Sequence, residues 1–130
     1  MKFLTAIVIL LAYSQAAAAV SLMQAYPSCD IEQQNSVKVK TGGSKTDLHA
    51  SHISLRINVL QADISTARKA RRLTQSQADM LWQHANRIRN DAARYVKKQG
   101  FLSAAERASY DREFDEIATK LCMKLTVGKS

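Results

Sequence analysis

Three helix-length segments dominate the pattern of hydrophobic and polar positions in this chain. In two of them, apolar residues recur every three or four positions, as in a helix that buries one face. These stripes are Ala78, Leu81, Ala85, Ile88, Ala92 and Tyr95, then Tyr110, Phe114, Ile117 and Leu121. No proline follows Pro27, so nothing after it breaks a helix. The pattern predicts an all-α fold, an antiparallel three-helix bundle with an irregular N-terminal arm.

A recurring phrase marks where each helix is expected to begin. A hydroxyl residue followed three places later by an acid or amide is typical of a capping box, in which each side chain bonds the other residue's backbone N–H. The phrase occurs as Ser44-Lys-Thr-Asp47, Thr74-Gln-Ser-Gln77 and Ser103-Ala-Ala-Glu106. Gly100 stands where the second helix should stop. We predict a domain of residues 44–126, with helices over about 44–70, 74–99 and 103–125.

The first helix differs from the others because it is apolar on two sides. One stripe contains Ile53, Ile57, Leu60, Ile64 and Ala67, and the other contains Leu48, Leu55, Val59 and Ala62. A three-helix bundle needs one of these faces for its core, and the second must be buried elsewhere. Three interpretations stay open for that second face: cover by the N-terminal arm, self-association into a homodimer, or contact with a partner or ligand.

The first residues predict export. Lys2 precedes an apolar run over residues 3–13, and the alanines at 16–19 offer a small-residue cleavage site. We expect a signal peptide over residues 1–19 and a mature chain without a transmembrane span, periplasmic or secreted. The alternative is an uncleaved anchor from Phe3 to about Met23, which polar residues leave short of the roughly 20 apolar residues that a span needs.

Residues 20–43 are expected to form an extended or disordered arm. They hold the only proline, two adjacent glycines and a polar run, and residues 36–40 alternate as in a short strand. Cys29 lies in this arm and Cys122 in the third helix. In an oxidising compartment the pair predicts a disulfide that ties the arm to the bundle. Two free thiols in a metal site are the alternative.

The charge balance favours anionic partners. The chain has 19 basic and 11 acidic residues, a formal net charge of +8, and loss of Lys2 with the leader lowers it to +7. A basic cluster, Arg68, Lys69, Arg71 and Arg72, closes the first helix. Nucleic acid is not expected as a partner, because an exported chain rarely meets it and no aromatic residues are interleaved with the arginines. We expect acidic or unfolded protein clients.

Candidate catalytic and metal sites are sparse. The sequence has no Gly-rich phosphate loop and no nucleophile elbow, and long helices with short turns leave little loop for an active site. We therefore predict that the protein is not an enzyme and needs no cofactor. His49 and His52 lie one helical turn apart, a spacing that can present two nitrogens to zinc or copper. The alternative is that both histidines are ordinary polar residues, since no third ligand is evident.

Two short segments resemble a known family. "LTQSQ" at Leu73–Gln77 is similar to the Leu-Thr-x-x-Gln signature of the CpxP and Spy-like periplasmic stress proteins, and "LSAAE" at Leu102–Glu106 resembles a second copy. The resemblance implies an exported, all-helical dimer with a cradle-like surface that holds unfolded envelope proteins. Some members of that family bind zinc or other metals. The alternative is a separate family of exported three-helix proteins.

These observations predict an exported, non-enzymatic helical binding protein, chaperone-like or an envelope-stress adaptor. The expected surface for a protein partner or unfolded client consists of Leu48, Leu55, Val59, Arg56, Arg68, Lys69, Arg71 and Arg72. One alternative is an immunity protein or inhibitor that binds one dedicated envelope toxin or enzyme. Another is a metal-responsive accessory protein that uses His49 and His52.

Overall fold

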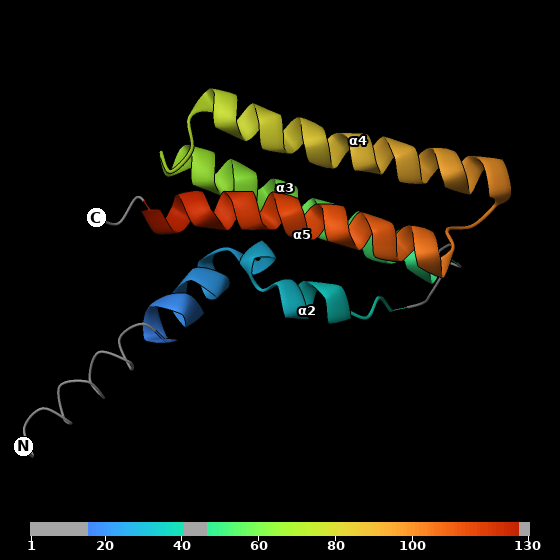
Figure 1. The fold of residues 1–130 in the computed structure, drawn as a ribbon, viewed down its shortest axis with the longest axis horizontal. Helices are drawn as coiled ribbons and strands as arrows, with labels where there is room; N and C mark the ends of the chain where they lie inside the picture. Colours follow the sequence, from blue (N-terminus) through green and yellow to red (C-terminus); the bar gives the residue numbers. More distant parts are fainter. Residues whose placement is uncertain (1–15, 41–46, 128–130) are drawn as a thin grey trace, which may run out of the picture.

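Three long helices form the body of the molecule. The computed structural model describes residues 16–40 and 47–127, and within these ranges every regular element is helical. The long helices are α3 (Leu48–Lys69), α4 (Gln75–Gln99) and α5 (Ala104–Val127). Consecutive helices run antiparallel, and α4 and α5 both pack against α3 (Figure 1). The predicted all-α fold with three antiparallel helices is confirmed.

Side-chain caps set two of the helix starts as the recurring phrase predicts. Thr74 and Gln77 form a reciprocal capping box at the start of α4. Ser103 and Glu106 exchange the equivalent bonds at the start of α5, at 2.8 and 3.1 Å. Gly100 ends α4 in the left-handed conformation, with φ at 87°. A residue without Cβ adopts that conformation without a steric penalty, which explains glycine at this position.

The start of α3 differs from the predicted one. The helix begins at Leu48 rather than near Ser44, because Asp47 is itself the N-cap and its carboxylate accepts from the N–H groups of His49 and Ala50. The same carboxylate accepts from the N–H of Leu102 at 2.8 Å. Asp47 thereby joins the start of α3 to the turn between α4 and α5. Ser44, the other half of the predicted box, lies outside the described residues.

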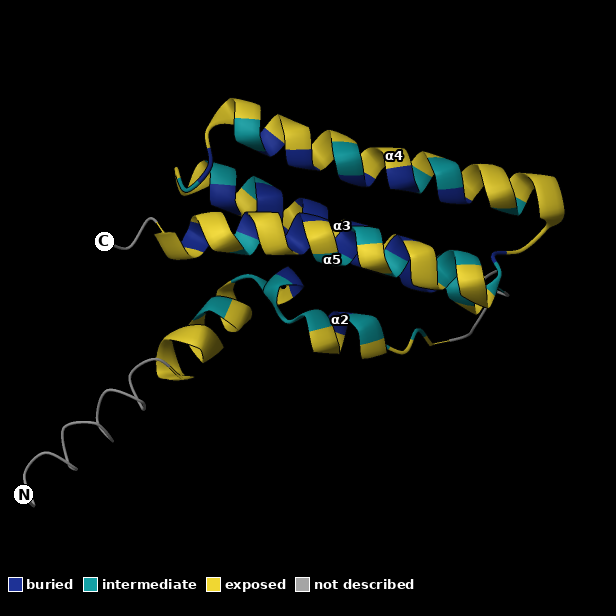
Figure 2. Cartoon of the chain, viewed as in Figure 1, coloured by how far each residue is buried: buried dark blue, intermediate teal, exposed yellow. Residues whose placement is uncertain are grey.

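The core lies between the long helices and follows the predicted stripes (Figure 2). On α3 the stripe from Ile53 to Ala67 is at most 2% exposed, and Phe114 and Ile117 of α5 are at most 1% exposed. The α4 stripe is buried from Ala78 to Ala92, but its last predicted member, Tyr95, is 43% exposed. In the final two turns of α4 the half-buried Val96, rather than Tyr95, packs against the core.

The N-terminal arm is irregular, as predicted, but it is neither extended nor disordered over its middle. Residues 16–25 are helical, η1 (Pro27–Cys29) is a 3-10 turn, and α2 (Ile31–Ser36) is a short helix. Pro27 favours the turn through its fixed φ, and Asp30 caps α2 by accepting from the N–H of Gln33. The short strand expected over residues 36–40 is wrong, because no described segment offers a strand to pair with it.

The arm lies along α3 and α5 on the side away from α4 (Figure 1). The predicted disulfide between Cys29 and Cys122 is present and fastens η1 to α5. Most of the predicted signal peptide, residues 1–15, lies outside the described residues. Among the helices that the structure describes, none is long and apolar enough to cross a membrane.

Candidate binding site

Arg56 is the centre of an ionic cluster between the arm, α3 and α5. Its side chain is 3% exposed. The guanidinium donates to Asp111, Asp115 and Asn35, each at 2.8 Å, and lies 5.3 Å from the ring centre of Phe114. The structure therefore gives Arg56 internal partners in place of the acidic client expected from the sequence.

His52 belongs to the same cluster. Its side chain is 2% exposed, with Nε2 2.8 Å from a carboxylate oxygen of Asp111 and Nδ1 3.3 Å from the carbonyl of Val37. Burial by itself would raise the pKa of Asp111, but hydrogen bonds from His52 and Arg56 outweigh it and hold that pKa below its usual range. The cluster thus keeps Asp111 ionised under the arm.

The predicted histidine pair lacks the surroundings of a metal site. Both ring nitrogens of His52 already face internal partners, whereas His49 Nδ1 is buried without one. Within residues 16–40 and 47–127, no group of three or more His, Cys, Asp or Glu side chains is placed to hold a metal ion. Zinc or copper binding through His49 and His52 stays a prediction.

Asp63 is a second buried carboxylate under the arm. It is 5% exposed and accepts from the N–H of Ser28 at 2.7 Å. Burial raises the pKa of Asp63, and the hydrogen bonding from Ser28 offsets this only in part. Among the described side chains, no cation lies within ion-pair distance of it. At neutral pH the folded state therefore carries a buried negative charge that lowers its stability.

We expect Asp63→Asn to raise the melting temperature by a few degrees at pH 7. The amide oxygen can still accept from Ser28 N–H, and the buried charge is gone. Because the folded pKa of Asp63 is raised, its favourable contribution exists below the ordinary aspartate pKa, near 4, and is lost as pH rises through the folded value. The gain should vanish in thermal melts below that pH. A uniform gain from pH 3 to 8 would contradict this account.

The other predicted client residues are spread along most of α3 and the turn that follows it. Leu48 and Leu55 are 49% and 37% exposed on α3, and Val59 is half-buried. The arm covers the polar side of α3 that carries His52, Arg56 and Asp63, not this apolar face. Along the axis of α3, at 1.5 Å per residue, Arg68 lies about 14 Å beyond Val59 and about 30 Å beyond Leu48. Self-association through the apolar face of α3 stays a prediction.

The four side chains of the basic cluster have different surroundings at the turn between α3 and α4. Arg68 donates to the side chain of Gln75 at 2.9 Å, while Lys69 is exposed. Arg71 is exposed and adopts a left-handed backbone with φ at 58°. Arg72 turns the other way and donates to the carbonyl of Leu125 on α5. Arg68 thus contacts the start of α4, whereas Arg72 contacts the end of α5.

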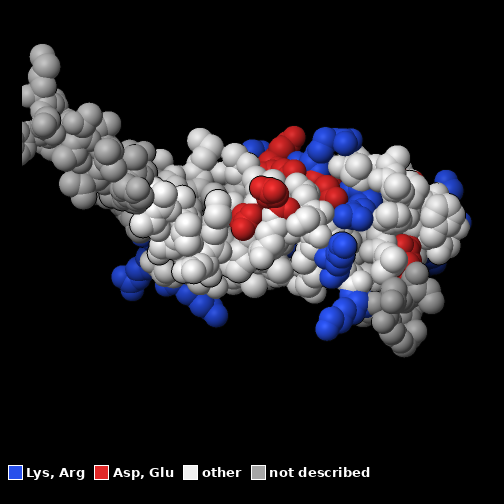
Figure 3. Space-filling model, turned by 90° about the horizontal axis from the view of Figure 1, so that it is seen from below, with Lys and Arg blue, Asp and Glu red and all other residues white. Residues whose placement is uncertain are grey.

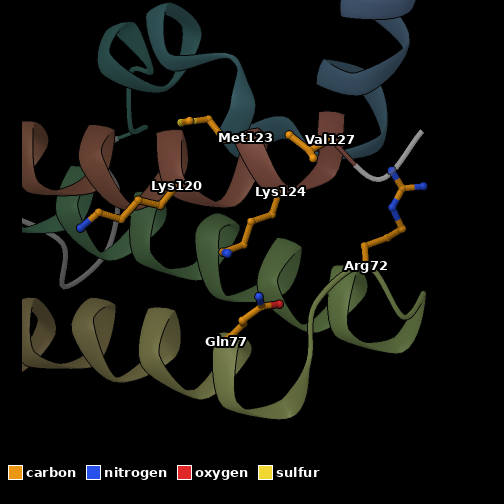
Figure 4. Close-up of a pocket in the computed structure, with 6 residues that line it drawn as sticks. All are labelled: Arg72, Gln77, Lys120, Met123, Lys124 and Val127. Carbon is orange, nitrogen blue, oxygen red and sulfur yellow. The ribbon is translucent and has the colours of Figure 1, made fainter. Parts of the chain in front are cut away.

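A surface cavity opens at the end of the bundle where α4 begins and α5 finishes. It has a volume of about 550 Å³ and is lined by Arg72, Gln77, Lys120, Met123, Lys124 and Val127 (Figure 4). Figure 4 shows Lys124 and Gln77 pointing toward one another across the space between α5 and α4. The cavity exists because α4 and α5 both pack on α3 but contact each other less closely.

A second cavity extends the first along α4. It has a volume of about 410 Å³, shares Gln77, Lys120 and Lys124 with the first, and continues to Arg87. We call the two together the α4–α5 groove. Its lining also includes Met80, which is 63% exposed, and His84, which lies 3.6 Å from Glu113.

The groove combines cations with flexible apolar side chains. Its lining holds two arginines and two lysines, and no Asp or Glu among the described residues that form it. Met123 is 62% exposed and Val127 74% exposed. The face that carries the arm is different, because acidic side chains there lie beside basic ones (Figure 3). The groove thus suits an acidic, partly apolar ligand better than the face that carries the arm.

Sequence reasoning missed the groove, although weak signals for it exist. Met80 and Met123 fall outside the core stripes, and Lys120 and Lys124 are one turn apart on α5. These features become one site only when α4 and α5 are placed side by side. Comparison of the chain with protein-family models, with curated proteins and with solved structures found no match in any of the three.

Proposed function

We propose that the chain is an exported, non-enzymatic binding protein of the chaperone-like kind. In this proposal it holds acidic, partly apolar segments of client proteins in the α4–α5 groove. The observation that carries the proposal is the lining of the groove, which combines the cations Arg72, Lys120 and Lys124 with exposed Met123 and Val127. The apolar leader and the Cys29–Cys122 disulfide support a periplasmic or secreted location.

Each part of the lining suits a client that varies in sequence. The methionine side chain has three rotatable bonds and a polarisable sulfur, so it fits apolar surfaces of different shape. Lysine and arginine attract carboxylates and speed encounter with acidic chains, an effect that the overall charge of +8 strengthens. The Leu-Thr-x-x-Gln resemblance supports the same class, but here Leu73 is in the core and Thr74 and Gln77 cap α4. Kinship therefore remains a proposal.

Charge reversal in the groove tests the proposal. We expect the protein to slow aggregation of a denatured acidic client diluted from guanidinium, measured by light scattering, and not that of a basic one. In Lys120→Glu/Lys124→Glu we expect client affinity to fall about tenfold or more, because two attractive contacts become repulsive. Lys40→Glu/Lys98→Glu is the matched control, with two exposed lysines outside the groove.

Three results would count against this function. Equal protection of acidic and basic clients would remove the role of charge. Equal loss in the groove variant and the control would show that net charge matters and the groove does not. One tight stoichiometric complex from an envelope extract, with no effect on aggregation, would favour the immunity or inhibitor alternative instead.

A further inference from the structure

We propose that the occupant of the α4–α5 groove is an acidic amphipathic helix of about three turns, presented by the client protein. This inference rests on the proposed function and specifies what the groove holds. Three features of the groove lead to this inference: the helices that form its walls, its length and the spacing of its cations. A fourth observation is that several acidic residues of this chain already have internal partners.

The walls of the groove favour a helical ligand over an extended one. They are the sides of α4 and α5, whose backbone N–H and C=O groups are already paired within each helix. The carbonyl of Leu125, near the end of α5, accepts from Arg72. No strand edge exists among the described residues that could pair with an extended chain. A helix brings its own backbone hydrogen bonds and needs only side-chain contacts, as in other helix-in-groove complexes.

The length of the groove sets the length of the ligand. On α4 the lining runs from Gln77 to Arg87, and on α5 from Lys120 to Val127. At 1.5 Å per residue these walls are about 15 and 10 Å long. A helix of about ten residues, or three turns, matches the longer wall. A single turn would leave much of the lining uncovered.

The cation spacing sets the charge pattern of the ligand. Lys120 and Lys124 lie one turn apart on α5, so they match carboxylates at positions i and i+4 of a helix lying alongside. Arg87 stands on the opposite wall, on α4. Met80, on the same wall as Arg87, supplies exposed apolar surface. The ligand is therefore a helix with an apolar stripe and acidic residues along its flanks.

A second copy of this chain does not fit that description. Several acids of α5 already have internal partners, since Asp111 and Asp115 both accept from Arg56. Glu113 lies 3.6 Å from His84. The charge complementarity thus points to a different protein as the source of the helix.

Three related peptides test the inference. The first is a 14-residue fluorescent peptide with a Leu/Ala stripe, Glu at i and i+4, and a covalent staple that keeps it helical. The second has two prolines, which prevent the helix, and the third has Lys in place of Glu. In fluorescence anisotropy we expect the acidic helix to bind the full oxidised protein at least tenfold more tightly than either of the others. Lys120→Glu/Lys124→Glu should lower that affinity about tenfold, and Lys40→Glu/Lys98→Glu should leave it unchanged.

Methionine methyl signals locate the bound peptide. Titration with the acidic helix should shift the NMR signals of Met80 and Met123, which line the groove, and leave that of Met23, which lies on the arm, in place. Light scattering should show one peptide per monomer without dimerisation.

The outcomes separate the inference from the proposed function. If the proline peptide binds the groove as tightly as the helix, the helical ligand is wrong and the proposed function stands. If the lysine peptide binds equally well, the acidic ligand is wrong. If no peptide binds and aggregation is not slowed either, both fail. Shifts at Met23 alone would place the binding surface on the arm and overturn the groove as the site.

Discussion

Replacing Cys29 and Cys122 by serine is expected to lower the free energy of unfolding by about 4–5 kcal/mol. The two cysteines are 93 residues apart, and a cross-link that closes so long a loop removes much of the entropy of the unfolded chain. Small domains are stable by roughly 5–15 kcal/mol, so the variant should lose a large part of its stability. Urea denaturation followed by circular dichroism at 25 °C measures the difference.

The arm should respond first when the disulfide is removed. Its contacts with α3 and α5 combine polar bonds, such as Ser28 N–H to Asp63, with side chains that are only partly buried, such as Tyr26 and Ile31. The core of the three long helices is fully buried and apolar. Hydrogen exchange should therefore quicken at residues 27–36 well before the middle of α4. Reductant should destabilise the wild-type protein by the same amount and leave the serine variant unaffected. A loss under about 1 kcal/mol would contradict the account.

The elements that the sequence predicts well are those set by local interactions. Thr74 and Gln77 are three residues apart, so the bond pattern that starts α4 can be read directly from the chain. The same holds for Gly100 and for the α5 stripe with Phe114 and Ile117, because helical spacing places neighbours on one face. The disulfide was predictable because only two cysteines are present.

The elements that the sequence does not reveal depend on contacts between distant segments. The helix α2 has only six residues, too few to be stable alone, and it forms on a surface to which Cys29 holds it. The burial of Arg56 depends on Asp111 and Asp115, more than 50 residues away. The groove likewise needs Gln77 and Lys124 on facing helices. Nothing in the local pattern distinguishes Arg56 from an exposed arginine such as Arg94.

Replacing Arg56 by methionine is expected to lower the free energy of unfolding by about 3 kcal/mol at pH 7. Methionine fills much of the same space against Phe114, but it leaves Asp111 and Asp115 without their main partner in a partly buried site. Removing one member of a buried ion pair typically costs about 3–5 kcal/mol. The lower end applies here because Asp115 is 29% exposed, and Arg107 and His52 still face Asp111.

The pH dependence of this loss identifies its cause. In the wild-type protein the pKa of Asp111 is lowered, so its stabilising contribution is present above the ordinary aspartate pKa and is lost as pH falls through the folded value. Without Arg56 the pKa of Asp111 should rise. The difference in the free energy of unfolding between Arg56→Met and the wild type should therefore shrink below about pH 4. Arg56→Met/Asp111→Asn should recover part of the loss at pH 7, because it removes one of the unpaired charges.

An exposed arginine provides the matched control for Arg56. Arg94 also pairs with an aspartate, Asp91, but its side chain is 75% exposed, and surface pairs contribute about 0–1 kcal/mol. Arg94→Met should therefore change stability by less than about 1 kcal/mol at any pH. If Arg56→Met were equally mild, the cluster under the arm would not hold the arm, α3 and α5 together.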